Sequence, residues 1–559
     1  MSLLRLFFPG VSALFCVSLS FTASAGAASV SCPVTHIAPS DAQTAFLHAD
    51  YDKAVTLYSA MLQQSPNDPV MVAALSRVLL RQQKYKEALA LVAKAEVVHP
   101  NNATLLAAQG FGEYRSGEPW KAIATLDAGW KENLCEPQIH LLSAQLNRLI
   151  SNYASWQREV ALAHQLAPDD PAIRGEWIST LPPAQRIAEL QAYLAEPNGD
   201  DAEERDNEQK YLKHLQDHLN APHKSCHLAS PVSQTEIPFA ALMHDATRIR
   251  SFGLEVKING KNSRLEIDTG AGGIYVSRSV AQRANLKPLY EAEAHGVGDH
   301  GPQSGYVSYA DSIRVGGLEF RDCIIKVSDR RNVVDSDGLI GMDVFSSFLV
   351  DLDYPMRKLM LSPLPPRPGE TNPATPSLHT DQAEGAQANA AVASTGSQSS
   401  AAAPSAKWQL HDRYIAPEMK SYTTFYRSGH DILLPTRLND ISTRLFLVDT
   451  GAFANIISPD TAREITKVHN TDSVTIHGIS GKVDKVYTAN KVIAQFAGIR
   501  QEIDDAYAFD TSRMSKDAGL EISGLLGFNT LRVLTVLIDY RDGLIKFDYV
   551  ADRGYNHFR

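Results

Sequence analysis

The sequence predicts a multidomain protein in which an all-α helical-repeat solenoid is followed by two mainly-β lobes. Three observations lead to this fold class. Residues 40–225 have helical periodicity and an internal repeat, with almost no strand signal. Residues 236–363 and 408–559 are rich in strand patterns and align with each other. Between them, residues 364–407 are rich in Pro, Ala, Ser and Thr. A chain of 559 residues is long enough for several domains that each bury a core.

The composition excludes some classes of function. The chain is 44% apolar and 21% charged, with a formal net charge of −10, and it has no basic cluster. This balance argues against a nucleic-acid partner, and diffuse negative charge points to no particular ligand. No spacing of Cys and His suggests zinc, and we expect neither a metal nor a cofactor.

The first 28 residues have the pattern of a bacterial signal peptide. An apolar run from Leu6 to Phe21 follows the single charge of Arg5, and small residues close the segment around Ala25 and Ala28. We expect cleavage there; the alternative, an uncleaved anchor, is disfavoured by an early proline and glycine and by the short apolar core. No later segment reaches about 18 apolar residues, so we expect no membrane span in the mature chain. The expected location is the periplasm or the secreted fraction.

Export would allow the cysteines to form disulfides, because disulfides persist in oxidising compartments. Structural bridges and buried free thiols both remain open for the four cysteines after the signal, and their connectivity cannot be read from sequence. These cysteines are Cys32, Cys135, Cys226 and Cys323.

The helical region, residues 40–225, repeats with a period of 34 residues. Alanines follow an aromatic residue at positions 54, 88 and 122, and prolines stand at 66 and 100. Small residues where helices touch, an aromatic at the second helix start and proline at the turn resemble tetratricopeptide repeats. Such hairpins bury their faces only against their neighbours and leave a concave groove. Two functions are open: the groove docks a peptide or protein partner, or the repeats are a spacer that orients the β lobes.

A short stretch occurs once in each β lobe. Residues 265–277 and 446–458 each contain an apolar run, the sequence Asp-Thr-Gly-Ala, and a second run that ends in Ser. A carboxylate at the mouth of a buried strand is costly to keep in a core. One such Asp could simply cap a turn, but two in matched frames suggest that Asp268 and Asp449 meet.

The downstream segments show that whole lobes are duplicated. Gly338–Gly341 aligns with Gly524–Gly527, and Asp353-Tyr354 aligns with Asp539-Tyr540. The second copy carries extra residues, which we place in the loop 501–523.

Together these segments resemble the retropepsin-like aspartic protease family, and the tandem pair resembles a bilobal, pepsin-like enzyme. The resemblance implies that Asp268 and Asp449 form a catalytic dyad, in which two carboxyls share one proton and serve as acid and base. It also implies support from the rest of both loops, with threonines bracing the loops against each other and glycines allowing close approach. These supporting residues are Thr269, Gly270, Ala271, Thr450, Gly451 and Ala452.

The resemblance further implies two hairpin flaps over a bound peptide, at residues 295–305 and 477–482. Tyr306 is a candidate substrate contact, although a core role is an open alternative, and the histidines of both hairpins fit hairpin-base hydrogen bonding better than catalysis. The flap and substrate candidates are Gly296, Gly298, Tyr306, Gly478 and Gly481.

Behind the loops, we expect Gly341 and Gly527 to pack against the two Asp-Thr-Gly segments. Asp343, whose counterpart is Asn529, is expected to cap the short helix that follows.

Residues 364–407 are expected to be a disordered linker, because they hold too few large apolar residues to bury a core. Such a tether permits pairing of the lobes within one chain or between chains. Effective concentration favours a monomer with an intrachain pseudo-dimer.

The function predicted from these observations is an exported aspartic endopeptidase that hydrolyses peptide or protein substrates, with the repeats docking substrate or a partner. The alternative is a non-catalytic peptide-binding or assembly protein that uses repeats and lobes as a scaffold. A glycosidase that uses the two carboxylates is a third interpretation, weakened because nothing resembles an aromatic sugar-binding cleft.

Overall fold

The computed structural model describes residues 32–37, 40–221, 224, 226–243, 245, 248–294, 303–328, 336–370, 410–471, 474, 476–478 and 481–551. The predicted signal peptide, Gly296, Gly298 and residues 371–407 of the predicted linker lie outside these ranges. The chain divides into residues 1–33 and a compact unit, Val34–Arg559, to which all of the following refers.

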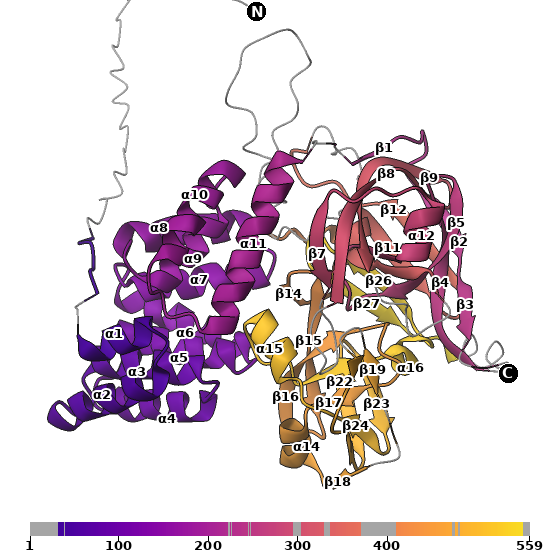
Figure 1. Cartoon of the computed structure of the whole chain (residues 1–559). Helices are drawn as coiled ribbons and strands as arrows, with labels where there is room; N and C mark the ends of the chain where they lie inside the picture. The colour runs from indigo at the N-terminus through magenta and orange to yellow at the C-terminus, as the bar shows by residue number, and fades with distance from the viewer. Residues whose placement is uncertain are drawn as a thin grey trace, which may run out of the picture. The chain divides into compact units, whose positions relative to one another are not determined.

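The predicted fold class is confirmed: a run of helices precedes a β-rich region with several sheets (Figure 1). The helices of the repeat region are α1 (Asp41–Leu47), α2 (Tyr51–Gln64), α3 (Pro69–Arg81), α4 (Tyr85–Glu96), α5 (Ala103–Arg115), α6 (Pro119–Glu132), α7 (Pro137–Leu149), α8 (Tyr153–Leu166), α9 (Pro171–Ser179), α10 (Pro183–Ala195) and α11 (Ala202–Asn220).

Local chemistry sets the helix boundaries in the repeats. Asp68 caps α3 by accepting hydrogen bonds from the backbone N–H groups of Val70 and Met71, both at 3.0 Å. Pro69 then occupies the first helical position, where no donor is lost. The alanines of the 34-residue period, at 54, 88 and 122, are fully buried, as expected where helices of a hairpin cross.

The first β lobe is built on one large sheet with the order β1-β9-β6-β10-β5-β4-β8-β7, and β3 pairs with β4. Cys226 forms a disulfide with Cys323 and so ties the start of this lobe to β9. The elements are β1 (His227–Leu228), β3 (Ala240–Met243), β4 (Ile249–Ile258), β5 (Lys261–Asp268), β6 (Ile274–Ser277), α12 (Arg278–Arg283), β7 (Tyr290–Ala294), β8 (Gln303–Val315), β9 (Leu318–Ser328), β10 (Gly338–Gly341) and the 3-10 helix η1 (Met342–Phe345).

The second lobe repeats this plan in a sheet with the order β18-β21-β24-β17-β25-β16-β15-β22-β23, with β14 paired to β15. Helix α15 lies in the loop where the sequence places the extra residues of this copy. The elements are η2 (Pro417–Met419), β14 (Tyr426–Ser428), β15 (Asp431–Leu438), β16 (Ser442–Val448), β17 (Ile456–Ile457), α14 (Pro459–Ile465), β18 (Val468–Asn470), β19 (His477–Gly478), β20 (Gly481–Lys482), β21 (Tyr487–Ala489), β22 (Val492–Phe496), β23 (Ile499–Ile503), β24 (Ala506–Ala508), α15 (Ser512–Ala518), β25 (Gly524–Leu526) and α16 (Phe528–Leu531).

A third sheet joins the lobes, with the order β13-β27-β26-β11-β12-β2. Its central pairing is antiparallel between β11 and β26, from Leu349 opposite Asp539 to Asp353 opposite Thr535. One apolar core runs through both lobes and this sheet. The strands are β2 (Thr235–Pro238), β11 (Phe348–Asp353), β12 (Lys358–Pro363), β13 (Thr423–Thr424), β26 (Thr535–Asp539) and β27 (Leu544–Asp548).

The repeats and the second lobe share a second apolar core. Buried residues of α5, α6 and α7, such as Leu126 and Leu142, belong to one cluster with Leu433, Leu447 and Leu525 of the lobe. Polar contacts of Arg115 border this cluster. Its guanidinium donates to the carbonyl of Gly519 at 2.8 Å, and its backbone carbonyl accepts from the N–H of Glu521 at 2.9 Å. These helices therefore support the second lobe from within the same chain.

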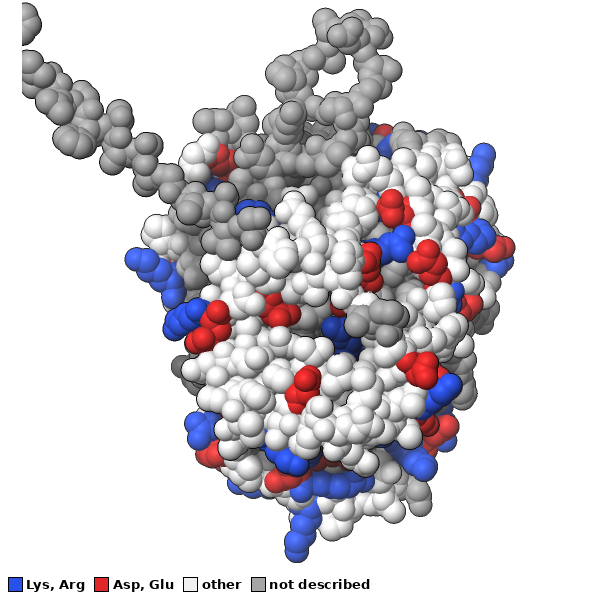
Figure 2. All heavy atoms as spheres, turned by 90° about the vertical axis from the view of Figure 1, so that its left-hand side faces the viewer, with Lys and Arg blue, Asp and Glu red and all other residues white. Residues whose placement is uncertain are grey.

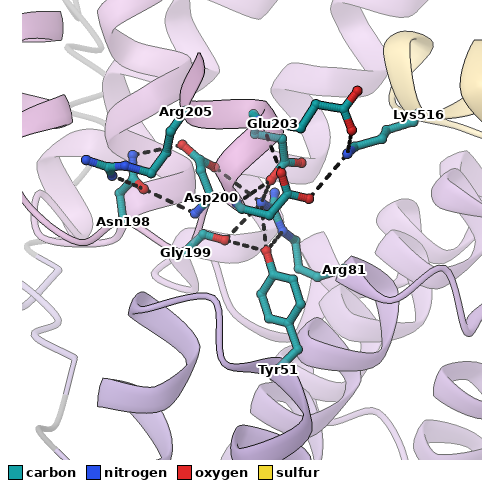
Figure 3. A network of polar contacts seen from close by, with 10 residues as sticks. Tyr51, Arg81, Asn198, Gly199, Asp200, Glu203, Arg205 and Lys516 are labelled. Atoms are coloured by element: carbon teal, nitrogen blue, oxygen red, sulfur yellow. Dashed lines mark hydrogen bonds and ion pairs between the residues drawn. The ribbon is translucent and has the colours of Figure 1, made fainter. Parts of the chain in front are cut away.

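A polar network fixes the start of α11 (Figure 3). The Tyr51 hydroxyl donates to the carbonyl of Gly199 at 2.7 Å, and Arg81 pairs with Asp200 and Glu204. Lys516 of α15 reaches the same helix start, where its ammonium lies 2.8 Å from Glu203. Helix α11 is thus connected both to the first repeats and to the second lobe.

On the face shown in Figure 2, acidic and basic side chains are scattered over a largely uncharged surface. Within the described ranges, no helix is long and apolar enough to cross a membrane.

Candidate active site

Each Asp-Thr-Gly loop follows a strand that is held by a later strand of the same lobe. In the first lobe, β10 runs parallel to β5 and places Gly341 opposite Asp268, while pairing antiparallel with β6 on its other side. In the second lobe, β25 lies between β16 and β17 in the same way. The backbone N–H of Asp449 donates to the carbonyl of Leu526 at 3.0 Å. Both loops are therefore fixed by strands on either side.

The two loops are hydrogen-bonded to each other through their threonines. The Thr269 hydroxyl donates to the carbonyl of Val448 at 2.7 Å and accepts from the N–H of Thr450 at 3.0 Å. In return, the Thr450 hydroxyl donates to the carbonyl of Ile267 and accepts from the N–H of Thr269, both at 3.0 Å. Each hydroxyl thus uses its proton and a lone pair across the lobe boundary, so the brace is reciprocal.

The carboxyl groups receive hydrogen bonds from their own loops. Asp268 Oδ1 accepts from the N–H of Gly270 at 2.9 Å. Asp449 Oδ1 accepts from two N–H groups, those of Gly451 at 2.9 Å and Ala452 at 3.0 Å. The second loop therefore offers one more donor to its carboxylate than the first, where the N–H of Ala271 is directed at a backbone carbonyl.

The glycines allow the two carboxyls to approach. A methyl group at Gly451 would lie 2.5 Å from Asp268 Oδ2, and one at Gly270 would lie 2.8 Å from the carboxyl carbon of Asp449. Both contacts are shorter than real side chains make. Any residue other than glycine would therefore displace the carboxyl of the opposite loop.

The surroundings of the two carboxyls act differently on their pKa values. Burial raises the pKa of Asp268 well above its usual range, and the charges of Asp449 and Glu266 and its hydrogen bond with Asp449 act in the same direction. Burial also raises the pKa of Asp449, but its two backbone donors, the hydrogen bond with Asp268 and the charge of His430 oppose that rise. The pair therefore favours one shared proton, and the additional backbone donor of the second loop stabilises a carboxylate on Asp449.

Two polar residues near the loops were not predicted in these positions. The expectation that Asp343 caps a helix is wrong: η1 has no side-chain cap, and Asp343 Oδ1 instead accepts from the N–H of Gly273 at 3.1 Å. The parallel placement of β10 brings Asp343 to that loop. His430, in the turn between β14 and β15, contacts the carbonyl of Gly270 through Nε2 at 3.2 Å. No sequence motif marks His430, because its partner lies 160 residues away.

The remaining predicted residues are placed as follows. Gly341 and Gly527 lie against the loops, since an added Cβ would meet the carbonyls of Ala271 and Ala454 at 2.2 and 2.4 Å. Tyr306 is partly buried against the main core, which agrees with the alternative role considered for it.

The second predicted flap contains a short hairpin, in which Gly478 of β19 pairs with Gly481 of β20. In the first, β7 pairs with β8, while Gly296 and Gly298 lie outside the described residues. Among the described residues, no group of three or more His, Cys, Asp and Glu is placed to hold a metal ion.

Comparisons with known proteins agree with both parts of this description. Residues 254–344, which include Asp268, match the family model described as aspartyl protease, and residues 45–110 match the tetratricopeptide repeat. The chain carries an aspartyl protease domain and tetratricopeptide repeats.

A search of curated proteins finds no match. Among solved structures, a thermophilic TPR protein of Thermus thermophilus is 17% identical, with 31% of this chain and 95% of that chain covered and a TM-score of 0.25. A score this low adds nothing to the fold assignment.

Proposed function

We propose that this protein is an aspartic endopeptidase in which Asp268 and Asp449 form one catalytic dyad. The observation that carries the proposal is the reciprocal threonine brace, which holds the two Asp loops face to face. The match of residues 254–344 to aspartyl proteases supports the same interpretation.

In the proposed reaction, Asp449 acts as the general base. It takes a proton from a water molecule as the water oxygen attacks the scissile carbonyl, while the proton on Asp268 supports the developing oxyanion. Asp449 then delivers the proton that it took from water to the leaving amine as the C–N bond breaks, and the proton of Asp268 stays on the dyad. Two carboxyls that share one proton supply acid and base together, because like charges in close contact cannot both ionise and their pKa values are pushed apart.

The geometry weighs against the glycosidase interpretation. Glycosidases hold their two carboxyls roughly 5 to 9 Å apart, to leave room for the sugar or a water molecule. Here Asp268 and Asp449 are close enough to share a hydrogen bond.

We further propose that the lobes pair within one chain as a pseudo-dimer. The threonine brace and the pairing of β11 with β26 both support this, since they join residues of the same chain. A monomer then has a complete site.

The proposal also includes export and a role for the repeats. The sequence pattern of residues 1–28 supports export to the periplasm or beyond. Helices α5–α7 support the second lobe, so a substrate or partner protein would dock on the parts of the repeat surface that this contact leaves uncovered.

The test is cleavage by single Asp variants of the full mature chain. Asp268→Asn and Asp449→Asn each remove one carboxyl without changing its size, and each should abolish cleavage of an unfolded protein substrate and inhibition by a pepstatin-type compound. Asp127→Asn, an exposed position on α6, is the matched control and should keep full activity.

Retained cleavage in both dyad variants would reject the shared site. If the wild type captures peptides that it never cuts, the binding-protein alternative is supported instead.

A further inference from the structure

We propose that His430 is a positioning residue for the dyad: it holds the first Asp loop from the second lobe and directs the ionised state to Asp449. This inference rests on the proposed peptidase function and adds to it a residue outside both Asp-Thr-Gly segments.

The first support is the contact with the loop itself. His430 Nε2 lies 3.2 Å from the carbonyl oxygen of Gly270. A carbonyl only accepts, so this ring nitrogen carries a proton and donates. The same nitrogen lies 3.2 Å from Asp431 Oδ1.

The second support is the position of Gly270 between His430 and Asp449. The Gly270 carbonyl contacts His430, while the Cα of Gly270 faces the Asp449 carboxyl closely enough that a methyl group there would lie 2.8 Å from the carboxyl carbon. The imidazole is therefore separated from Asp449 by a single glycine residue. A protonated ring at this place stabilises a carboxylate on Asp449.

The third support is that the contact breaks the symmetry of the duplicated lobes. The two Asp-Thr-Gly-Ala loops are equivalent in sequence, and their threonine braces are reciprocal. The polar contact of His430 Nε2 is with the first of them, although His430 belongs to the second lobe. A device of this kind can assign different roles to two otherwise matched carboxyls.

Several charged groups face His430 and the dyad. Asp431 lies on the same turn, Asp343 of η1 and Asp449 are within electrostatic reach of the ring, and Arg427 of β14 acts on Asp343. On the other side of the dyad, buried Glu266 of β5 acts on Asp268. Asp431, Asp343 and Asp449 thus lie within reach of the imidazole, and a cation at this place interacts favourably with each of these three carboxyls.

The experiment is the pH dependence of kcat/KM for three variants of the full mature chain. His430→Gln keeps a donor for the Gly270 carbonyl but removes the charge, His430→Lys keeps both a donor and a charge, and His430→Ala removes both. The acid limb of kcat/KM reports the free enzyme's catalytic base. We expect that limb to move upward by about half a unit to one unit in His430→Gln, and to stay near the wild-type position in His430→Lys.

For His430→Ala we expect the same upward shift together with a fall in kcat of roughly tenfold, because the Gly270 carbonyl loses its donor. His469→Gln, an exposed histidine on β18, is the matched control and should leave the profile unchanged. The ring of His430 is 28% exposed, so these changes are not core substitutions, and thermal midpoints near that of the wild type would verify the fold.

An unchanged acid limb in folded His430→Gln would overturn the proposal, as would an equal shift in His430→Lys. These outcomes are separate from failure of the proposed function, which the Asp268→Asn and Asp449→Asn variants report by themselves. A purely structural role for His430 would lower stability and kcat without moving the limb.

Discussion

Replacing Gly451 by Ala tests how closely the two carboxyls must approach. The new methyl group would lie 2.5 Å from Asp268 Oδ2, 2.6 Å from its carboxyl carbon and 2.7 Å from Oδ1. The φ angle of Gly451 is not in the left-handed region, so alanine causes no backbone strain there and the cost is purely steric. The carboxyl would have to move by at least about 0.5 Å to reach a contact of about 3 Å, and by more for normal packing.

A displacement approaching 1 Å within a catalytic group costs about 100-fold in rate. We therefore expect kcat/KM of Gly451→Ala to fall by roughly 100-fold, equivalent to about 2.7 kcal/mol of transition-state stabilisation. The threonine brace should survive, because it does not involve the carboxyl, so the thermal midpoint should change by only a few degrees. Initial rates on a fluorogenic peptide and titration with a pepstatin-type inhibitor measure the effect.

Gly175→Ala supplies the matched control, since it adds the same methyl group in α9 and brings it no closer than 3.5 Å to Tyr193 Oη. It should leave activity unchanged and raise stability slightly, by up to about 1 kcal/mol, because alanine favours a helix interior more than glycine does. If folded Gly451→Ala keeps activity within about threefold of the wild type, the close approach of the carboxyls is not needed and the reasoning about the dyad fails.

Two further predictions concern stability. Burial raises the pKa of Asp539, in the sheet that joins the lobes, to about 6 from its ordinary value of 3.8. Because the pKa is higher in the folded state than in the unfolded state, the contribution of Asp539 to the free energy of unfolding is present below about pH 4 and is lost as pH rises through about 6. The change is on the order of 2 to 3 kcal/mol. Asp539→Asn should therefore flatten the pH dependence of the free energy of unfolding between about pH 4 and 7, and an unaltered slope in urea titrations would contradict this. The Cys226–Cys323 disulfide spans 97 residues of sequence, and its loss in Cys226→Ser with Cys323→Ser should destabilise the first lobe by about 3 to 5 kcal/mol; equal thermal midpoints for this variant and the oxidised wild type would refute it.

Much of the architecture follows from periodicity and duplication. The 34-residue spacing of buried alanines predicts the helical hairpins, because with this spacing each repeat has an alanine at the same helix–helix contact. The matched Asp-Thr-Gly-Ala segments predict two equivalent lobes, and the extra residues of the second copy fall where α15 forms. The expectation for Asp343 failed because its partner, the N–H of Gly273, lies 70 residues away and is reached only through the parallel pairing of β10 with β5.

The fold class and the importance of Asp268 and Asp449 can be predicted from the amino-acid sequence, since both depend on local patterns that occur once in each duplicated lobe. The contacts that these patterns make could be found only from the three-dimensional packing of the chain. It brings the lobes together through β11 and β26, turns the repeats into a support for the second lobe, and sets His430 against Gly270. Contacts between residues far apart in the chain depend on how sheets and helices pack, and a single sequence carries no local signal of that packing.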